Sequence, residues 1–188
     1  MHSETIISIP LSKNKIVKLL IFSLIFVAAG LWILIAQPQT SNFIFNNVWL
    51  KNTAGGISAI MGIAGVFYFA RKLTDNQPGL VIDNEGFTDN SSAVALGKIY
   101  WQDVIAVEEK AIQASLASKQ RFVTVLLKNP ETYINRYPDG IRKKMMLMNV
   151  KYSGTPVNIS ANSLKTNFTE LKQLLQQQFD TFRSNQMV

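Results

Sequence analysis

The side chains that could carry out acid–base or metal chemistry are few in this sequence. The 188 residues contain no cysteine, and the only histidine is His2, beside the N-terminus. Histidine-based acid–base catalysis and a zinc site of the usual His/Cys kind both need more of these side chains than the chain has. We therefore expect no catalytic residue, no metal and no cofactor.

The carboxylates are the next candidates for chemistry. Glu108 and Glu109 are adjacent, so on a strand they would point to opposite faces and could not act as a paired acid and base. The serines at 91–92 have no histidine or placed lysine that would activate a nucleophile. An enzyme would need a deep polar pocket that gathers several of four side chains, Asp83, Asp89, Asp103 and Lys98. The sequence therefore predicts a protein that is not an enzyme.

A basic segment is the main candidate for binding. Arg142, Lys143 and Lys144 precede the apolar run Met145 to Met148. Cations beside flexible apolar side chains suit a surface that rests on anionic headgroups, where each charge contributes about 1 kcal/mol. Methionine-rich surfaces also bind protein partners. The alternative is that the methionines fill the core and the three charges form a solvated face, and the sequence leaves both open.

Two apolar segments must position whatever the chain binds. Residues 16–36 hold one charge, Lys18, and as a helix they span roughly 30 Å, the thickness of a bilayer's hydrocarbon core. The run is too long for the apolar region of a cleaved signal peptide, so we predict a retained transmembrane helix. Residues 48–70 form a second span, in which Trp49 and Tyr68 suit the membrane interfaces.

The charges that flank the spans predict their orientation. Lys13 and Lys15 precede the first span, Arg71-Lys72 follow the second, and the loop 37–47 between them is uncharged. The positive-inside rule then places both termini in the cytoplasm. We expect a helical hairpin in the inner (cytoplasmic) membrane, with residues 1–15 and the linker 71–78 on the cytoplasmic side and the lipid bilayer as its solvent.

Small residues form a seam on the second span. They recur at steps of three, four and three, at Gly55, Ser58, Gly62 and Gly65. In lipid, close backbone approach and dispersion hold helices together, and small residues permit that approach. The seam could pack against the first span through Ser23 and Gly30, form a homo-oligomer, or pack against a helix of another membrane protein.

Residues 79–185 have the composition of a small domain rich in strands. We expect strands at 80–83, 87–89, 94–101, 104–110, 121–128 and 157–159. Gly86 is expected to supply a positive φ in the turn after the first of them. Residues 141–152 match both a helical and a strand pattern, and we favour a helix to about Asn149.

Two helices in this domain have clear N-terminal signals. Asn129 and Pro130 begin a short helix as N-cap and first residue, which should end at 138–140. Asn167 and Glu170 form a capping box, and an apolar face follows at Phe168, Leu171, Leu174, Leu175 and Phe179. Short strands followed by an amphipathic helix predict an α+β fold in which the C-terminal helix caps a small sheet or barrel.

The stretch PGLVIDNEGFTDNSSAVALGKIYWQDVIAVE, residues 78–108, resembles the opening of bacterial PH-like domains. Its corner, residues 99–105, places Trp101 in the expected core and Asp103 at a turn. With the two spans, the NSSA and KNPE turns and the GTPVNIS segment, the chain resembles a family of small bacterial two-span membrane proteins over most of residues 10–180. The resemblance implies a PH-like domain but no activity, and the stretch 128–157 departs from a minimal PH-like layout.

These observations lead to two hypotheses of function. The first is a non-enzymatic membrane protein that presents a PH-like domain to the membrane surface, to itself or to another protein. The second is an accessory subunit of a larger membrane complex that packs through the second span. Phosphoinositide binding is not expected because the turn at Asp83-Asn84-Glu85 is acidic, and nucleic acid is not expected because residues 71–188 carry only +4.

Overall fold

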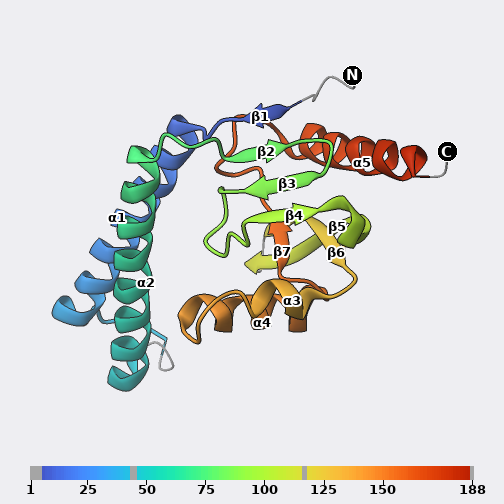
Figure 1. Ribbon diagram of the computed structural model, residues 1–188. Coiled ribbons are helices and arrows are strands. Elements are labelled where there is room, and N and C mark those ends of the chain that lie inside the picture. Colours follow the sequence, from blue (N-terminus) through green and yellow to red (C-terminus); the bar gives the residue numbers. More distant parts are fainter. Residues whose placement is uncertain (1–5, 43–45, 116–117, 187–188) are drawn as a thin grey trace. The chain divides into compact units, whose positions relative to one another are not determined.

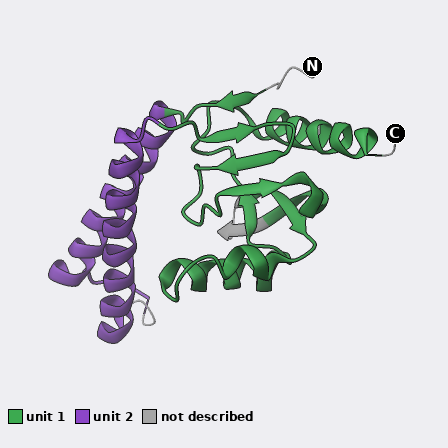
Figure 2. Ribbon diagram, viewed as in Figure 1, with its two compact units in different colours: residues 1–12, 77–188 green, residues 13–76 purple. Residues whose placement is uncertain are grey.

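The chain forms two compact units (Figure 2). The computed structural model describes residues 6–42, 46–115 and 118–186, so His2 lies outside the described residues. Unit 1 comprises residues 1–12 and 77–188, and unit 2 comprises residues 13–76. The mixed α+β arrangement expected from the sequence is confirmed: two apolar helices come first, and antiparallel sheets and a C-terminal helix follow (Figure 1).

Unit 2 is a hairpin of two long helices, α1 (Lys13–Ala36) and α2 (Val48–Thr74). Both are long and apolar enough to cross a membrane, judged by length and composition. Large apolar side chains such as Phe22, Trp32 and Phe67 are exposed on their outer faces. Helix α1 begins three residues before the first expected span, 16–36, and α2 ends four residues after the second, 48–70.

One sheet of unit 1 has four antiparallel strands in the order β1 (Ile7–Ile9), β2 (Leu80–Ile82), β3 (Gly86–Asp89) and β4 (Lys98–Tyr100). Strand β1 was not expected from the sequence. It precedes the helical hairpin, yet it pairs with β2, which follows the hairpin, with Ile9 opposite Leu80 (Figure 1). The N-terminal segment therefore completes a sheet that the rest of the chain supplies.

Two local expectations in this sheet were wrong. Residues 94–97 are not part of a strand: Val94 and Leu96 are buried in the core, and Gly97 has a φ of 74° that interrupts an extended chain. Gly86 does not adopt the left-handed conformation that was expected. It is glycine because β3 passes close to β4, where an added Cβ would lie 2.0 Å from the Ile99 carbonyl oxygen.

The second sheet consists of β5 (Val104–Ser115), β6 (Ser118–Leu127) and β7 (Val157–Ile159), all antiparallel. A short 3-10 helix, η2 (Trp101–Asp103), makes the corner between β4 and β5. Trp101 is buried as expected and lies 5.1 Å from Phe87 and 6.2 Å from Phe179, measured between ring centroids. Its indole N–H donates to the Asp83 carbonyl, which satisfies the one polar group that the ring carries.

Three helices complete unit 1: α3 (Pro130–Ile134), α4 (Ile141–Ser153) and α5 (Phe168–Asn185). Helix α3 ends four residues before the expected stop, and Asn129 makes no side-chain cap bond. The capping box of α5 is confirmed, and its buried residues Leu171, Leu175 and Phe179 lie toward β5 and β6. The expected helix over 141–149 is also confirmed and continues to Ser153.

Candidate functional site

Helix α4 exposes an apolar stripe that we define as Ile141, Met145, Met148 and Tyr152. These residues recur at i, i+4, i+7 and i+11, so they share one face of the helix. Their exposed fractions are 81%, 40%, 56% and 72%. The opposite face packs on unit 1 through Met146, which is fully buried. Of the methionines in this run, Met146 is therefore in the core, whereas Met145 and Met148 are at the surface.

Several bonds fix the C-terminal end of α4 to the second sheet. Gly154 adopts a left-handed conformation (φ 77°), and its N–H donates to Val150. The Ser153 hydroxyl accepts from Asn158 of β7 at 2.8 Å, and the Lys110 ammonium of β5 donates to the Ser153 carbonyl at 2.7 Å. A cation on the last carbonyls of a helix also complements its dipole. The stripe is therefore held on a fixed element.

The three basic residues proposed from the sequence have different surroundings. The Arg142 guanidinium lies over the Tyr137 ring, 4.1 Å from its centroid, and donates to the Ala95 carbonyl. Lys143 pairs with Asp139 at 2.9 Å, four residues earlier. Lys144 is exposed, and the structure shows no ion pair for it among the described residues. Of the three, Lys144 alone has its ammonium available at the surface of α4.

A second exposed lysine lies on the same side of α4. Lys151 is seven residues after Lys144, two turns along the helix, so both ammonium groups border the same edge of the apolar stripe. The sequence argument missed Lys151, Ile141 and Tyr152 as parts of this surface. The i, i+4, i+7, i+11 spacing could have found Ile141 and Tyr152, but it competed with an alternating pattern. The seven-residue spacing from Lys144 could have found Lys151.

The polar side chains that an enzyme would need to gather are distributed in separate pairs. Asp83 pairs with Lys98 at 3.0 Å, and Glu85 pairs with the same lysine at 2.7 Å. Asp89 accepts hydrogen bonds from the Ser91 hydroxyl and N–H. Asp103 accepts from the Tyr133 hydroxyl at 2.5 Å. Within the described residues, no group of three or more His, Asp or Glu side chains could hold a metal ion.

Tyr133 links α3 to the corner at η2. Its hydroxyl donates to the Asp103 carboxylate and accepts from the Tyr100 N–H at 3.2 Å. Burial raises the pKa of Tyr133, and the hydrogen bond to Asp103 raises it further, because both disfavour the phenolate. Tyr133 is 1% exposed. Tyr133 therefore has a structural role: its hydroxyl connects α3 to the residues of the corner.

The pair of Asp83 and Lys98 predicts a pH dependence of stability. Burial raises the pKa of Asp83, but hydrogen bonds from Lys98 and from the N–H groups of Glu85 and Gly86 outweigh it, so the pKa lies below the ordinary 3.8. A carboxyl whose pKa is lowered on folding stabilises the folded state above its unfolded pKa, and this contribution is lost as the pH falls through the folded pKa.

We expect Asp83→Asn to reduce the free energy of unfolding by about 0.5–1 kcal/mol near neutral pH, because the pair is partly solvated. The difference between variant and parent should shrink as the pH falls below about 4, where the parent loses its carboxylate. Urea unfolding of the detergent-solubilised chain at several pH values measures it. A difference that is constant from neutral to acidic pH would contradict the assignment.

An open groove runs beside α5. Its lining includes Glu109, which pairs with Arg121 at 3.4 Å and with Lys172 at 3.2 Å. The Arg121 guanidinium also lies 4.1 Å from the centroid of the Phe168 ring. Glu109, Arg121 and Lys172 are thus engaged with one another, and Asp180 of the same lining accepts from the Gln176 amide. Glu109 therefore serves as the shared ion-pair partner of two basic side chains.

The small-residue seam of α2 faces α1 within the hairpin. A Cβ added to Gly62 would lie 2.7 Å from the Val27 nitrogen, and one added to Gly55 would lie 3.0 Å from the Gly30 oxygen. Ser58 donates its hydroxyl hydrogen to the Phe26 carbonyl at 3.0 Å. Added carbon on Gly65 would meet the Ser23 hydroxyl. All four seam residues thus lie against α1 within one chain.

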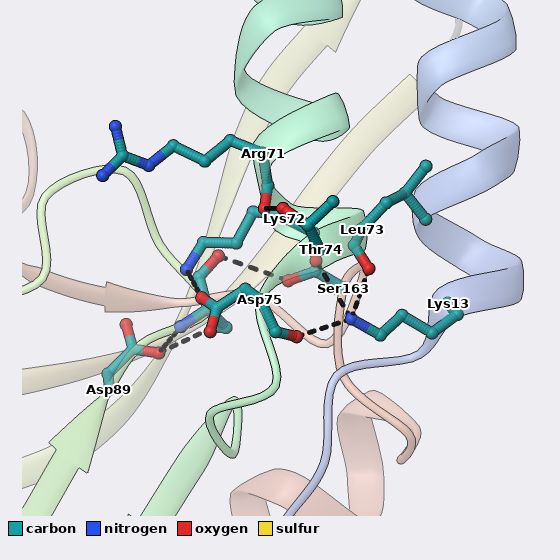
Figure 3. A network of polar contacts seen from close by, with 9 residues as sticks. Lys13, Arg71, Lys72, Leu73, Thr74, Asp75, Asp89 and Ser163 are labelled. Atoms are coloured by element: carbon teal, nitrogen blue, oxygen red, sulfur yellow. Dashed lines mark hydrogen bonds and ion pairs between the residues drawn. The ribbon is translucent and has the colours of Figure 1, made fainter.

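Lys13 connects the start of α1 to the end of α2, at the end of the hairpin opposite the loop (Figure 3). Its ammonium donates to the carbonyls of Lys72, Leu73 and Asp75, at 3.2, 2.8 and 2.5 Å. The last carbonyls of a helix lack intrahelical partners, so a lysine there satisfies them and complements the helix dipole. Lys72 also pairs with Asp75 at 2.9 Å. The sequence argument used Lys13 only as a flanking charge.

A second lysine lies at the loop end of the hairpin. Lys51 is 7% exposed, and its ammonium donates to the Asn46 side-chain oxygen at 3.3 Å and to the Gln37 carbonyl at 3.5 Å. Gln37 has a positive φ of 45° and donates its side-chain N–H to Asn52 at 2.7 Å. These bonds direct the charge of Lys51 toward the loop rather than toward the apolar faces of the helices.

Comparison of the chain with protein-family models, with curated proteins and with solved structures finds no match.

Proposed function

We propose that this is a non-enzymatic integral membrane protein that holds a PH-like domain at the cytoplasmic face of the inner membrane for interaction. The observation that carries the proposal is the pairing of β1 with β2. The hairpin α1–α2 is inserted between these two strands in the chain. Two adjacent strands of one sheet lie on one side of a membrane, so both ends of the hairpin must emerge on that side.

The charges that flank the helices indicate on which side of the membrane unit 1 lies. Lys13, Lys15 and Lys18 lie at the start of α1 and Arg71 and Lys72 at the end of α2, whereas the loop between the helices carries no charge. Cytoplasmic flanks of membrane helices are enriched in lysine and arginine. This asymmetry supports a cytoplasmic location for unit 1 and therefore for both termini.

The architecture of unit 1 supports the PH-like assignment. A four-stranded and a three-stranded antiparallel sheet follow each other in the chain, and α5 lies against the second. Antiparallel strands followed by a C-terminal helix are what the resemblance leads us to expect, and they support the proposal. The β1 strand of such a domain would here be separated from β2 by the membrane hairpin.

An interaction role is favoured over catalysis by how the polar groups are used. Asp83, Asp89 and Asp103 each bond to a different partner, Lys98, Ser91 and Tyr133. The apolar stripe of α4 is exposed among the described residues of unit 1 and is the surface that best suits binding.

Cysteine labelling tests this proposal, because the chain has no cysteine of its own. Single cysteines would replace Ser41, in the loop between the helices, and Gln177, exposed on α5. A membrane-impermeant maleimide should label position 41 in intact spheroplasts and position 177 only after permeabilisation. The protein should stay with the membranes after alkaline extraction. Release into the supernatant, or labelling of position 177 in intact spheroplasts, would overturn the proposal.

A further inference from the structure

Helix α4 is buried at Met146 and Ser153 and exposes most of its other residues, among them the apolar stripe. One face of α4 is anchored by Met146 and by the bonds around Ser153, and the face opposite the core exposes the stripe. Tyr152 and two methionines are side chains that pack readily among lipid headgroups and upper acyl chains, since they are long or carry a polar tip. An exposed apolar face next to basic residues is a feature that α4 shares with helices that lie in a membrane interface.

The charges around the stripe select an anionic surface. Helix α4 contains four basic residues and no acidic one. Arg142 and Lys143 are held by contacts within unit 1, whereas Lys144 and Lys151 are exposed along one edge of the stripe. A surface of apolar side chains bordered by lysines complements an interface with apolar depth and negative headgroups.

Chain connectivity keeps unit 1 near such an interface. Three residues join β1 to α1, and five residues join α2 to β2. At about 3.5 Å per residue, these connections extend at most roughly 10 Å and 18 Å. Docking of α4 is then an intramolecular event with a high effective concentration, so a modest contact area is sufficient.

We propose that α4 docks on the anionic lipid surface of the membrane that the hairpin spans, with Ile141, Met145, Met148 and Tyr152 inserted among the headgroups and Lys144 and Lys151 paired with lipid phosphates. This inference rests on the proposed function and names the partner of its interaction domain. A protein partner or a second copy of the chain is a different occupant, and the experiment separates it.

The test uses the full chain reconstituted into vesicles, with a polarity-sensitive fluorophore on a single cysteine. Met148→Cys reports on the stripe, and Gln177→Cys on exposed α5 is the matched control. In vesicles that contain phosphatidylglycerol, the label at position 148 should shift to the blue and be quenched by lipid-attached quenchers. In pure phosphatidylcholine, or at high salt, both effects should weaken. The label at position 177 should behave as in water throughout.

Charge variants test which lysines act. Lys144→Gln with Lys151→Gln should lower the ratio of docked to undocked protein on anionic vesicles by about thirtyfold, at about 1 kcal/mol for each lysine. Lys128→Gln with Lys165→Gln removes the same charge from exposed positions outside α4 and should change the ratio less than twofold. An equal effect of the two pairs would show that net charge, rather than α4, governs the label, and would overturn the proposal.

Three further outcomes would overturn it. The label at position 148 could be as exposed to water as the label at position 177 in both kinds of vesicle. Its protection could be the same in both and insensitive to salt, which indicates burial against protein. Its protection could disappear as the protein is diluted in lipid, which indicates self-association. In each case the chain would still be inserted and oriented, so failure here is distinguishable from failure of the proposed function.

Discussion

A chain in which a short glycine–serine linker replaces residues 13–76 is expected to fold as a soluble domain, whereas residues 77–188 alone are not. The shorter fragment lacks residues 1–12 and so loses Ile9 of β1 and Leu11 after it, which are 8% and 7% exposed. Burial of each such side chain contributes about 1.5–3 kcal/mol. The fragment also exposes the edge of β2, so the total loss of about 3–6 kcal/mol approaches the stability of a whole domain.

Urea unfolding followed by circular dichroism compares the stability of the linked protein with that of the fragment. The linked protein should show one cooperative transition, and the fragment a much lower midpoint or no transition. Two substitutions in the linked protein provide the matched control. Ile9→Ser should lower the midpoint strongly, whereas Ile6→Ser should not, because Ile6 is 62% exposed. Equal stability of fragment and linked protein would show that β1 is dispensable to the sheet.

The second large effect concerns the contact between α1 and α2. A side chain at Gly30 would meet backbone, because its Cβ would lie 2.6 Å from the Ala59 nitrogen and 2.7 Å from the Gly55 oxygen. Backbone cannot yield as a flexible side chain can, so Gly30→Leu and Gly62→Leu should force the helices apart. Gly56→Leu is the control on α2, the helix that also contains Gly62, since nothing lies within 4 Å of an added Cβ at Gly56.

Disulfide formation between introduced cysteines measures this separation. A Cβ on residue 65 would lie 3.1 Å from the Ser23 Cβ, close to the spacing that a disulfide needs. Cysteines at 23 and 65 should crosslink within one chain, more than about tenfold more slowly when Gly30 or Gly62 is leucine. Gly56→Leu should leave the rate unchanged. A crosslinked dimer in place of the crosslinked monomer would instead support the homo-oligomeric interpretation of the seam.

Local sequence signals were sufficient to predict those elements whose signals lie within their own residues. The two apolar helices followed from composition, and α5 followed from the pairing of Asn167 with Glu170 at its first turn. Strand β1 could not be found in this way. Three residues have no periodicity of their own, and the partner Leu80 is 71 positions after Ile9 in the chain.

The candidate site was found in part for a related reason. The basic segment marked α4 correctly, but which charges remain exposed depends on distant residues. Arg142 is held by Tyr137 and by Ala95, whose carbonyl is 47 positions away in the sequence. The methionine run was ambiguous because both helical and strand periods fitted it, and packing of Met146 into the core decided the question.

The placement of the hairpin between β1 and β2 has a consequence for biogenesis. If only one helix inserted, Ile9 and Leu80 would end on opposite sides of a hydrocarbon layer about 30 Å thick and could not meet. The same sheet would then lack its first strand and expose an unpaired edge, a form that cellular proteases recognise more readily than a closed domain. Under the proposed topology, completion of the sheet would therefore require that both helices be inserted, and a molecule with only one inserted helix would leave the edge of β2 unpaired.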